Sequence, residues 1–219
     1  MSDPEFSLEE VARYWDDNAA AWAGEVRQGH DLAREFLNNP ASLAFIGDLR
    51  GREVLDAGCG EGYNTRILAR TGAHMTGVDL STVVSFMALM DGPRFDLAMA
   101  ECFRTLRPGG LLAFSITHPC FITKGARWIR DEQGNYFDPA RWVERWRFTD
   151  APPEAPEFVV PRFDRTLSEY INTLTGVGFV FKRIEEPRPP EEYCQAHPGQ
   201  RGWRDHAALF LHVLAEKPS

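Results

Sequence analysis

The 219-residue sequence predicts an α/β fold, a doubly wound and mostly parallel sheet with helices on both faces. Three observations predict it. A short apolar strand begins at Val54, and a glycine-rich turn follows it. Residues 63–70 then have the apolar spacing of a helix, and a second apolar strand over residues 75–78 ends at Asp79. Strands that alternate with helices favour a parallel sheet.

The first expected element is a helix over about residues 7–23. Ser7 is a helix cap, and Glu10, three residues later, completes a capping box with it. Phe6 and Val11 flank this start as a hydrophobic staple.

The glycine-rich turn is the first candidate binding site. Gly58, Gly60 and Gly62 stand between the strand and the helix, where glycine permits unusual dihedrals and lets the main chain approach a ligand. An ordinary tight turn is the alternative interpretation. Asp79 follows Gly62 by 17 residues, and a carboxylate there can accept hydrogen bonds from both hydroxyls of a ribose.

The charges around this turn select among nucleotide ligands. A pyrophosphate prefers the bare positive end of a helix, but Glu61 occupies the first turn and Asp56 ends the preceding strand. Two carboxylates are better suited to a ligand that carries an ammonium and a sulfonium. S-adenosylmethionine is such a ligand, with a ribose and an adenine besides.

The chain after Asp79 contains a conflict. If residues 83–87 form the next parallel strand, only residues 80–82 join the two strands, whereas a parallel crossover takes about a dozen residues or more. In one interpretation, Ser81 caps a helix over residues 82–90 and the next strand is 95–100.

In the other interpretation, residues 82–90 are the strand and residues 93–106 are the helix. A segment of about 30 or more residues is then absent between Ser81 and Thr82. This second interpretation is favoured because the apolar positions of 95–106 repeat with a helical period up to the glycine-containing stop at 107–110.

Several segments together resemble one known family, the class I S-adenosylmethionine-dependent methyltransferases, in the small-molecule group with the quinone-biosynthesis methyltransferases. They are residues 54–62, 77–80 and 106–114, the predicted helix 167–175, and the predicted strands 178–185 and 208–216. The resemblance implies a Rossmann-like sheet that closes with an antiparallel C-terminal strand pair. It covers most of the chain from residue 8 onward, with residues 120–163 matched least. We therefore expect residues 1–219 to form a single methyltransferase domain, with 120–163 as a lid or insertion.

The resemblance also implies the cofactor and its contacts. S-adenosyl-L-methionine is the expected cofactor. The N-terminal helix would fold over it, with Tyr14 covering the methionine end. The remaining expected cofactor-binding residues are Asp56, Gly58, Cys59, Gly60, Asp79 and Leu80.

The expected reaction is methyl transfer to an O or N nucleophile of a small molecule. His118 follows the strand 111–117 and is a candidate general base, because its ordinary pKa lies near neutrality. The alternative is that it only shapes the turn before Pro119, since positioning of the nucleophile can carry this reaction without a base. Met87, Phe121 and Trp15 are the candidate substrate-binding residues.

Composition sets further bounds. A net charge of −8 makes a nucleic-acid substrate less favoured, and no apolar run has the length of a membrane span. Four scattered cysteines and no export signal favour the cytoplasm. Cysteine and histidine spacings give little support to a metal site. Oligomeric state is not encoded in an evident way, and a homodimer stays open.

Two rival functions remain open. A nicotinamide-dependent oxidoreductase also uses a glycine-rich turn and an acidic strand end, but Tyr63 stands where its third glycine or alanine is expected. A cofactor-binding protein without transferase activity is the second rival.

Overall fold

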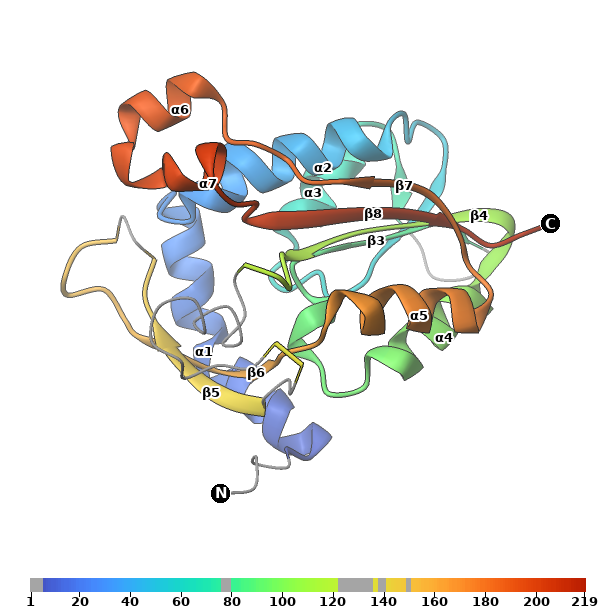
Figure 1. Ribbon diagram of the computed structural model, residues 1–219, viewed down its shortest axis with the longest axis horizontal. Helices are drawn as coiled ribbons and strands as arrows, with labels where there is room; N and C mark the ends of the chain where they lie inside the picture. Colours follow the sequence, from blue (N-terminus) through green and yellow to red (C-terminus); the bar gives the residue numbers. More distant parts are fainter. Residues whose placement is uncertain (1–5, 76–79, 122–135, 138–140, 149–150) are drawn as a thin grey trace.

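The computed structural model describes residues 6–75, 80–121, 136–137, 141–148 and 151–219. Its main feature is a six-stranded sheet with the order β2-β1-β3-β4-β8-β7 (Figure 1). The pairs β2–β1, β1–β3 and β3–β4 are parallel, and β4–β8 and β8–β7 are antiparallel. The strands are β1 (Glu53–Asp56), β2 (His74–Met75), β3 (Leu80–Phe86), β4 (Leu106–Thr117), β7 (Val180–Glu185) and β8 (Phe210–Glu216). The predicted mostly parallel sheet with an antiparallel C-terminal pair is confirmed.

Helices lie on both faces of this sheet. In Figure 1, α2 and α3 lie above the sheet, whereas α4 and α5 lie below it. The helices are α1 (Leu8–Arg27), η1 (Arg34–Asn38, a π-helix), α2 (Asn39–Ile46), α3 (Tyr63–Arg70), η2 (Leu89–Asp91), α4 (Phe95–Thr105), α5 (Leu167–Val177), α6 (Glu191–Ala196), η4 (Pro198–Gln200) and α7 (Gly202–Asp205).

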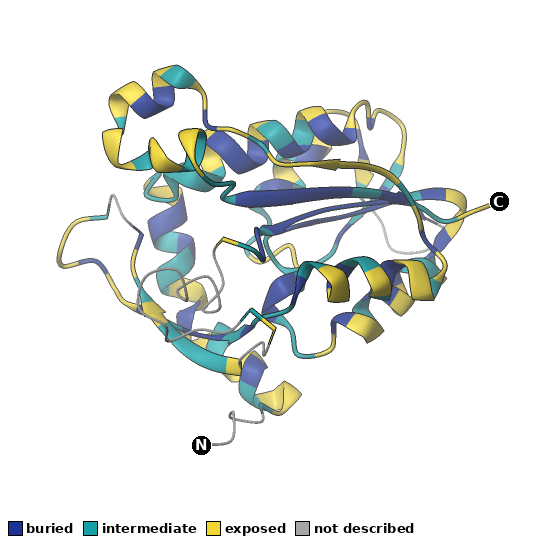
Figure 2. Cartoon of the chain, in the orientation of Figure 1, coloured by how far each residue is buried: buried dark blue, intermediate teal, exposed yellow. Residues whose placement is uncertain are grey.

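Two apolar clusters hold the layers together. The cluster below the sheet joins α4 and α5 to the strands through residues such as Met99 and Leu174, both fully buried. The cluster above joins α2 and α3 through Ile46 and Leu68. Every residue of β3 is buried, as expected for a parallel strand covered on both faces, whereas β7 at the sheet edge is largely exposed (Figure 2).

The chain after β2 decides between the two interpretations of residues 82–106. Residues 80–86 form strand β3, which pairs with β1 and β4, and residues 95–105 form helix α4. The alternative with a helix over 82–90 and a strand over 95–100 is therefore wrong. Residues Val83 and Val84 are β-branched and fit a sheet that is buried on both faces.

A separate two-stranded sheet packs against α1. Its strands are β5 (Arg141–Trp146) and β6 (Phe158–Phe163), which are antiparallel. Trp22 of α1 contacts Trp146, Phe148 and Phe158, with ring centroids 4.9–5.3 Å apart. The expected lid region 120–163 thus contains a hairpin joined to the N-terminal helix by aromatic packing.

Helix α1 also forms hydrogen bonds with the backbone at the edge of β6 that does not pair with β5. The Asn18 amide donates to the Val159 carbonyl at 2.9 Å and accepts from the Val159 amide at 3.3 Å. The predicted capping box at the start of α1 is present, since Ser7 and Glu10 bond to each other's backbone amides. The helix extends to Arg27, four residues beyond the expected end.

Candidate cofactor site

The glycine-rich turn lies where the sequence predicts it, between β1 and α3. Gly58 has a φ of +80°, and a Cβ atom placed on it would lie 2.4 Å from the Cβ atom of Ala88. Gly60 and Gly62 also have positive φ values of 55° and 82°. Glycine is therefore required at 58 by both backbone conformation and contact, because Ala88, just beyond β3, packs against the turn.

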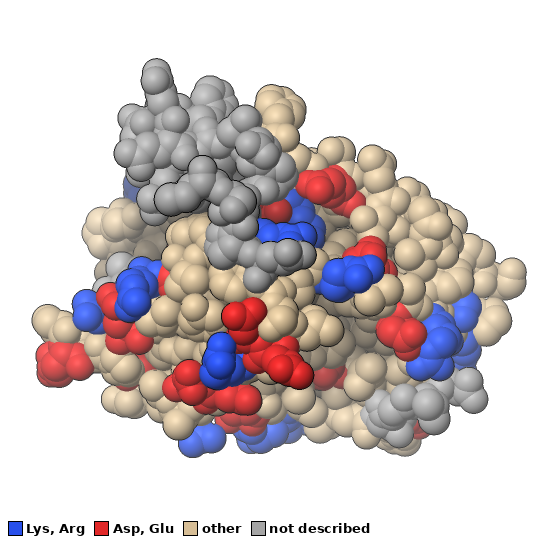
Figure 3. All heavy atoms as spheres, turned by 90° about the horizontal axis from the view of Figure 1, so that it is seen from below, with Lys and Arg blue, Asp and Glu red and all other residues tan. Residues whose placement is uncertain are grey.

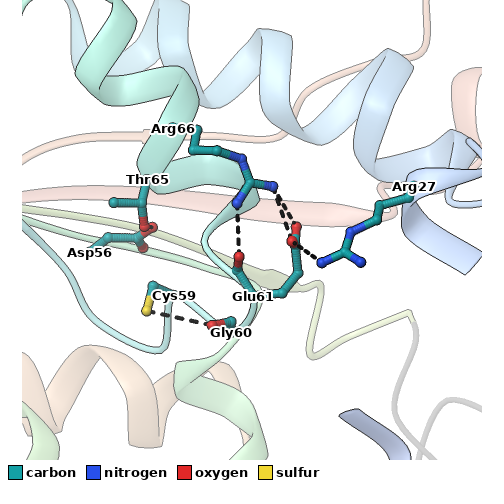
Figure 4. Close-up of polar contacts among 7 residues, drawn as sticks. All are labelled: Arg27, Asp56, Cys59, Gly60, Glu61, Thr65 and Arg66. Atoms are coloured by element: carbon teal, nitrogen blue, oxygen red, sulfur yellow. Dashed lines mark hydrogen bonds and ion pairs between the residues drawn. The ribbon is translucent and has the colours of Figure 1, made fainter. Parts of the chain in front are cut away.

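Asp56 ends β1 directly under this turn. Its carboxylate accepts a 2.7 Å hydrogen bond from the Thr65 hydroxyl in the first part of α3 (Figure 4). Burial raises the pKa of Asp56, and the bond from Thr65 opposes that shift. Thr65 thus orients the carboxylate of Asp56.

Glu61 is not a free negative charge, contrary to the interpretation from the sequence. Arg66 donates to its two carboxylate oxygens at 2.9 and 3.0 Å, and Arg27 of α1 donates at 3.2 Å (Figure 4). Hydrogen bonds from these arginines outweigh partial burial and lower the pKa of Glu61. Glu61 therefore fastens α1 and α3 to the turn, whereas Asp56 forms no ion pair with a described residue.

Cys59 is exposed at the tip of the turn, with its thiol 3.8 Å from the Gly60 carbonyl oxygen. The fold thus brings together Asp56, Gly58, Cys59 and Gly60 of the predicted cofactor residues. Asp79 lies outside the described residues. Leu80 is not brought to the turn: it starts β3 at the opposite, amino edge of the sheet and is fully buried.

The aromatic residues of α1 pack on other aromatic side chains. Tyr14 packs edge-on against Phe6 at 6.1 Å, and Phe6 in turn contacts Phe163 of β6. Trp15 packs against Trp22 at 5.6 Å. These contacts show aromatic packing between α1, Phe6 and β6, and Arg27 at the other end of α1 reaches the turn.

His118 lies at the carboxyl edge of the sheet, as predicted, directly after β4. Its ring is buried; Nε2 lies 2.7 Å from a carboxylate oxygen of Glu186, and Nδ1 accepts a 3.2 Å hydrogen bond from the Cys120 amide. Since Nδ1 is an acceptor, the neutral ring carries its proton on Nε2 and donates it to Glu186. Burial lowers the pKa of His118, although Glu186 opposes this, so the ring is neutral at pH 7.

The other predicted acceptor residues surround the same edge. Met87 follows β3 with a φ of +60°, which is uncommon for a residue other than glycine and marks local strain at this strand end. Phe121 is 40% exposed, and its ring centroid lies 4.7 Å from that of His118.

A pocket at the carboxyl edge of the sheet is lined by charged side chains that were not among the predicted site residues. Its lining residues are Met90, Thr117, Pro119, Arg162, Phe163, Asp164 and Tyr170. Arg162 of β6 contacts Asp91 at 3.4 Å and Glu144 at 3.3 Å. Burial raises the pKa of Asp91 to about 6. The hairpin is thus fastened to the sheet edge by a buried ion pair.

Sequence reasoning missed these long-range partners. Thr65 could have been found, because it lies in the first turn of α3, where a side chain faces back to the strand end. Arg162 and Glu186 approach Asp91 and His118 only through sheet pairing, which no local pattern encodes. Among the described residues, no group of three or more potential ligands could hold a metal ion. No described helix is long and apolar enough to cross a membrane.

The strand, turn and helix around a buried carboxylate define the chain first as an α/β protein with a nucleotide-cofactor site. Comparisons with known proteins narrow this. A family model described as a methyltransferase domain matches residues 27–96. The ubiquinone biosynthesis O-methyltransferase of Coxiella burnetii (strain Dugway) is 38% identical over 226 aligned residues, which cover 96% of this chain and 85% of the relative. The chain therefore belongs to the class I S-adenosylmethionine-dependent methyltransferases.

Other relatives match shorter parts. The ubiquinone biosynthesis O-methyltransferase of Alkalilimnicola ehrlichii is 31% identical over 146 aligned residues, and the match covers 48% of this chain and 55% of the relative. The chain thus spans about half the length of that protein.

Solved structures agree on the fold. An S-adenosylmethionine-dependent methyltransferase from Mesorhizobium loti has a TM-score of 0.59 at 19% identity, covering 81% of this chain and 96% of its own. A 1,6-didemethyltoxoflavin-N1-methyltransferase from Burkholderia thailandensis, solved with 1,6-didemethyltoxoflavin and S-adenosylhomocysteine, has the same TM-score at 15% identity. It covers all of this chain and 94% of its own.

Proposed function

We propose that this chain transfers the methyl group of S-adenosyl-L-methionine to an oxygen or nitrogen nucleophile of a small molecule by in-line displacement. The observation that carries the proposal is the glycine turn, in which Gly58 packs on Ala88 above the buried carboxylate of Asp56. The names of the curated relatives support an oxygen nucleophile. The sulfonium is already activated, so holding the nucleophile in line and excluding water are the main tasks of the protein.

The proposed cofactor contacts follow from the turn. The main chain of Gly58, Cys59 and Gly60 lies against the amino-acid tail, and Asp56 accepts a hydrogen bond from its ammonium. Asp79 binds the ribose hydroxyls. Tyr14 covers the methionine end of the cofactor, and its ring also packs on Phe6.

The proposed acceptor site lies at the carboxyl edge beyond β3 and β4. Met87 and Phe121 supply apolar walls there, and the hairpin of β5 and β6 closes the far side through Arg162. Trp15 belongs to the same region through its contact with Trp22, which packs on the hairpin. In this proposal residues 120–163 are a lid or insertion of a single domain, and the hairpin of β5 and β6 is its described part.

His118 is proposed to have one of two roles at this edge. As a general base it would need a free ring nitrogen, and both nitrogens are engaged, one by Glu186 and one by the Cys120 amide. The geometry therefore favours a positioning role. His118→Gln is expected to lower kcat without removing an acidic limb from the pH profile. Loss of such a limb would support the base instead.

The partner and compartment proposals rest on charge and chemistry. Acidic and basic side chains alternate on the face seen in Figure 3, which supports a small-molecule acceptor over a nucleic acid. All four cysteines are free thiols, which supports a cytoplasmic location. Neither observation bears on oligomeric state.

Calorimetry and turnover together test the proposal. S-adenosylhomocysteine is expected to bind and NADH to give no heat. A panel of phenol and amine acceptors is then incubated with S-adenosylmethionine, and release of S-adenosylhomocysteine is measured. NADH binding without S-adenosylhomocysteine binding would favour the oxidoreductase. Cofactor binding without turnover on any acceptor would favour a protein that binds the cofactor and does not transfer.

A further inference from the structure

The order of strands conflicts with the length of chain that joins two of them. Strand β1 lies between β2 and β3, and both neighbours run parallel to it. Val54 of β1 pairs with Met75 on one side and with Thr82 on the other. Residues 75 and 82 are therefore level in the sheet, two strand spacings or about 10 Å apart.

Too few residues separate β2 from β3 for this arrangement. Strand β2 ends at Met75 and β3 begins at Leu80, so four residues lie between them. Because the strands are parallel, a chain that leaves β2 toward the carboxyl edge has to re-enter at the amino edge, past β1. Such crossovers take a dozen residues or more and are usually made by a helix on one face of the sheet.

The burial of β1 indicates where that helix belongs. Although β1 has a strand on each side, its residues alternate between buried and half-buried. Leu55 is half-buried on the face that carries α4 and α5, whereas Val83, its partner in β3, is fully buried. On β1 and β2, Glu53 and His74 pair at 3.3 Å with 45% and 66% of their side chains exposed. A parallel strand inside a doubly wound sheet is normally covered on both faces.

The relatives contain additional residues. Against the Alkalilimnicola protein, 146 aligned positions include 48% of this 219-residue chain, about 105 residues, so about 41 positions have no counterpart here. Against the Coxiella protein, 226 positions include 96% of the chain, about 210 residues, which leaves about 16. Both numbers exceed the dozen residues that a crossover needs.

We infer that this chain lacks a crossover segment of about 16 to 41 residues between β2 and β3, and that the half-buried face of β1 around Leu55 is the surface on which its helix packs. The inference stands on topology, burial and alignment, and does not require a particular cofactor. One consequence does rest on the proposed function. The segment would lie close in the sequence to Asp79, the proposed ribose ligand, so its absence leaves the cofactor open on that side and weakens binding.

An insertion experiment tests this inference. The residues of the Coxiella relative that have no counterpart here are inserted immediately before Leu80, where β3 begins, and a glycine–serine segment of the same length is the matched control. Urea unfolding and calorimetry with S-adenosylhomocysteine are measured for the full chain and both variants. The relative's segment is expected to raise the urea midpoint and the m-value, because it buries more surface, whereas the control leaves both unchanged or lower.

The outcomes separate this inference from the proposed function. A stabilising segment that also tightens S-adenosylhomocysteine binding at least tenfold supports both. A stabilising segment without any cofactor binding supports the inference and refutes the proposed function. No stabilisation beyond the control overturns the inference, even if S-adenosylhomocysteine binds the unmodified chain tightly. A stable dimer of the unmodified chain that the insertion disrupts also overturns it, since a second copy would then cover the face.

Discussion

Replacement of Gly58 by alanine is expected to destabilise the protein and to remove cofactor binding together. Two costs add at this position. A φ of +80° costs a residue with a Cβ about 1–2 kcal/mol. The new Cβ would also lie 2.4 Å from the Cβ of Ala88, whereas carbon atoms prefer about 3.5–4.0 Å, and relief of such overpacking costs about 1–3 kcal/mol.

The expected total is about 2–5 kcal/mol, a large part of the 5–15 kcal/mol that keeps a typical domain folded. Urea unfolding of wild type and Gly58→Ala measures it directly. Gly176→Ala is the matched control, because Gly176 lies in helix α5 with nothing within 4 Å of the added Cβ. That control is expected to be neutral or stabilising by up to about 1 kcal/mol.

A double variant separates the two costs. Ala88→Gly removes the atom that the new Cβ meets and leaves the backbone cost, so Gly58→Ala/Ala88→Gly is expected to recover about 1–3 kcal/mol relative to the sum of the single changes. Equal stability of wild type and Gly58→Ala, or no coupling between positions 58 and 88, would refute the account of this turn. Calorimetry of the still-folded Gly58→Ala variant with S-adenosylhomocysteine tests the predicted loss of cofactor binding.

Three further predictions concern stability. Burial lowers the pKa of His212 from 6.5 to about 4. As the pH drops from 6.5 to 4 the unfolded chain binds this proton and the folded chain does not, so the free energy of unfolding falls by about 3 kcal/mol. In His212→Gln, urea unfolding is expected to show no such acid sensitivity. The effect of Asp91 on stability has the opposite sign. Its pKa is raised from 3.8 to about 6, so its protonation in the folded state adds about 3 kcal/mol to the free energy of unfolding as the pH falls from 6 to 3.8. In Asp91→Asn that gain should vanish, and an unchanged pH profile would contradict the burial of its charge. Asn18→Ala leaves both backbone groups of Val159 unpaired and should cost about 1–3 kcal/mol in thermal unfolding, while Asp17→Ala on the exposed face of α1 should cost little.

Local patterns in the sequence predicted most of the helices and strands. The capping box at Ser7 and the apolar spacing of residues 63–70 predicted α1 and α3, because cap and helix signals act within one or two turns. The glycine turn was equally readable, since positive φ values restrict the residue type directly. These features form the first part of the proposed cofactor site.

Contacts between distant segments could not be predicted in the same way. The charge of Glu61 was interpreted as free because Arg27, 34 residues away, reaches it only after α1 has packed. Residues 151–161 contain four prolines, a composition typical of a surface loop, yet Phe158 and Val160 are buried in strand β6. Pairing with β5 and packing on α1 override the local composition there.

The conflict between Asp79 and the next strand was visible in the sequence for a general reason. A parallel crossover has a minimum length that does not depend on side chains. In the structure Met75 and Thr82 both pair with Val54, so the two strands lie on either side of β1 and the short connection has to cross it.

Amide NMR of the full chain titrated with S-adenosylhomocysteine tests whether the glycine turn binds the cofactor, and it also detects weak binding. The largest shift changes are expected at the amides of Cys59, Gly60 and Gly62, with smaller changes at Ala88. No comparable changes are expected with NADH at the same concentrations. Shift changes confined to other parts of the chain, or equal changes with NADH, would contradict the assignment of the glycine turn as an S-adenosylmethionine site.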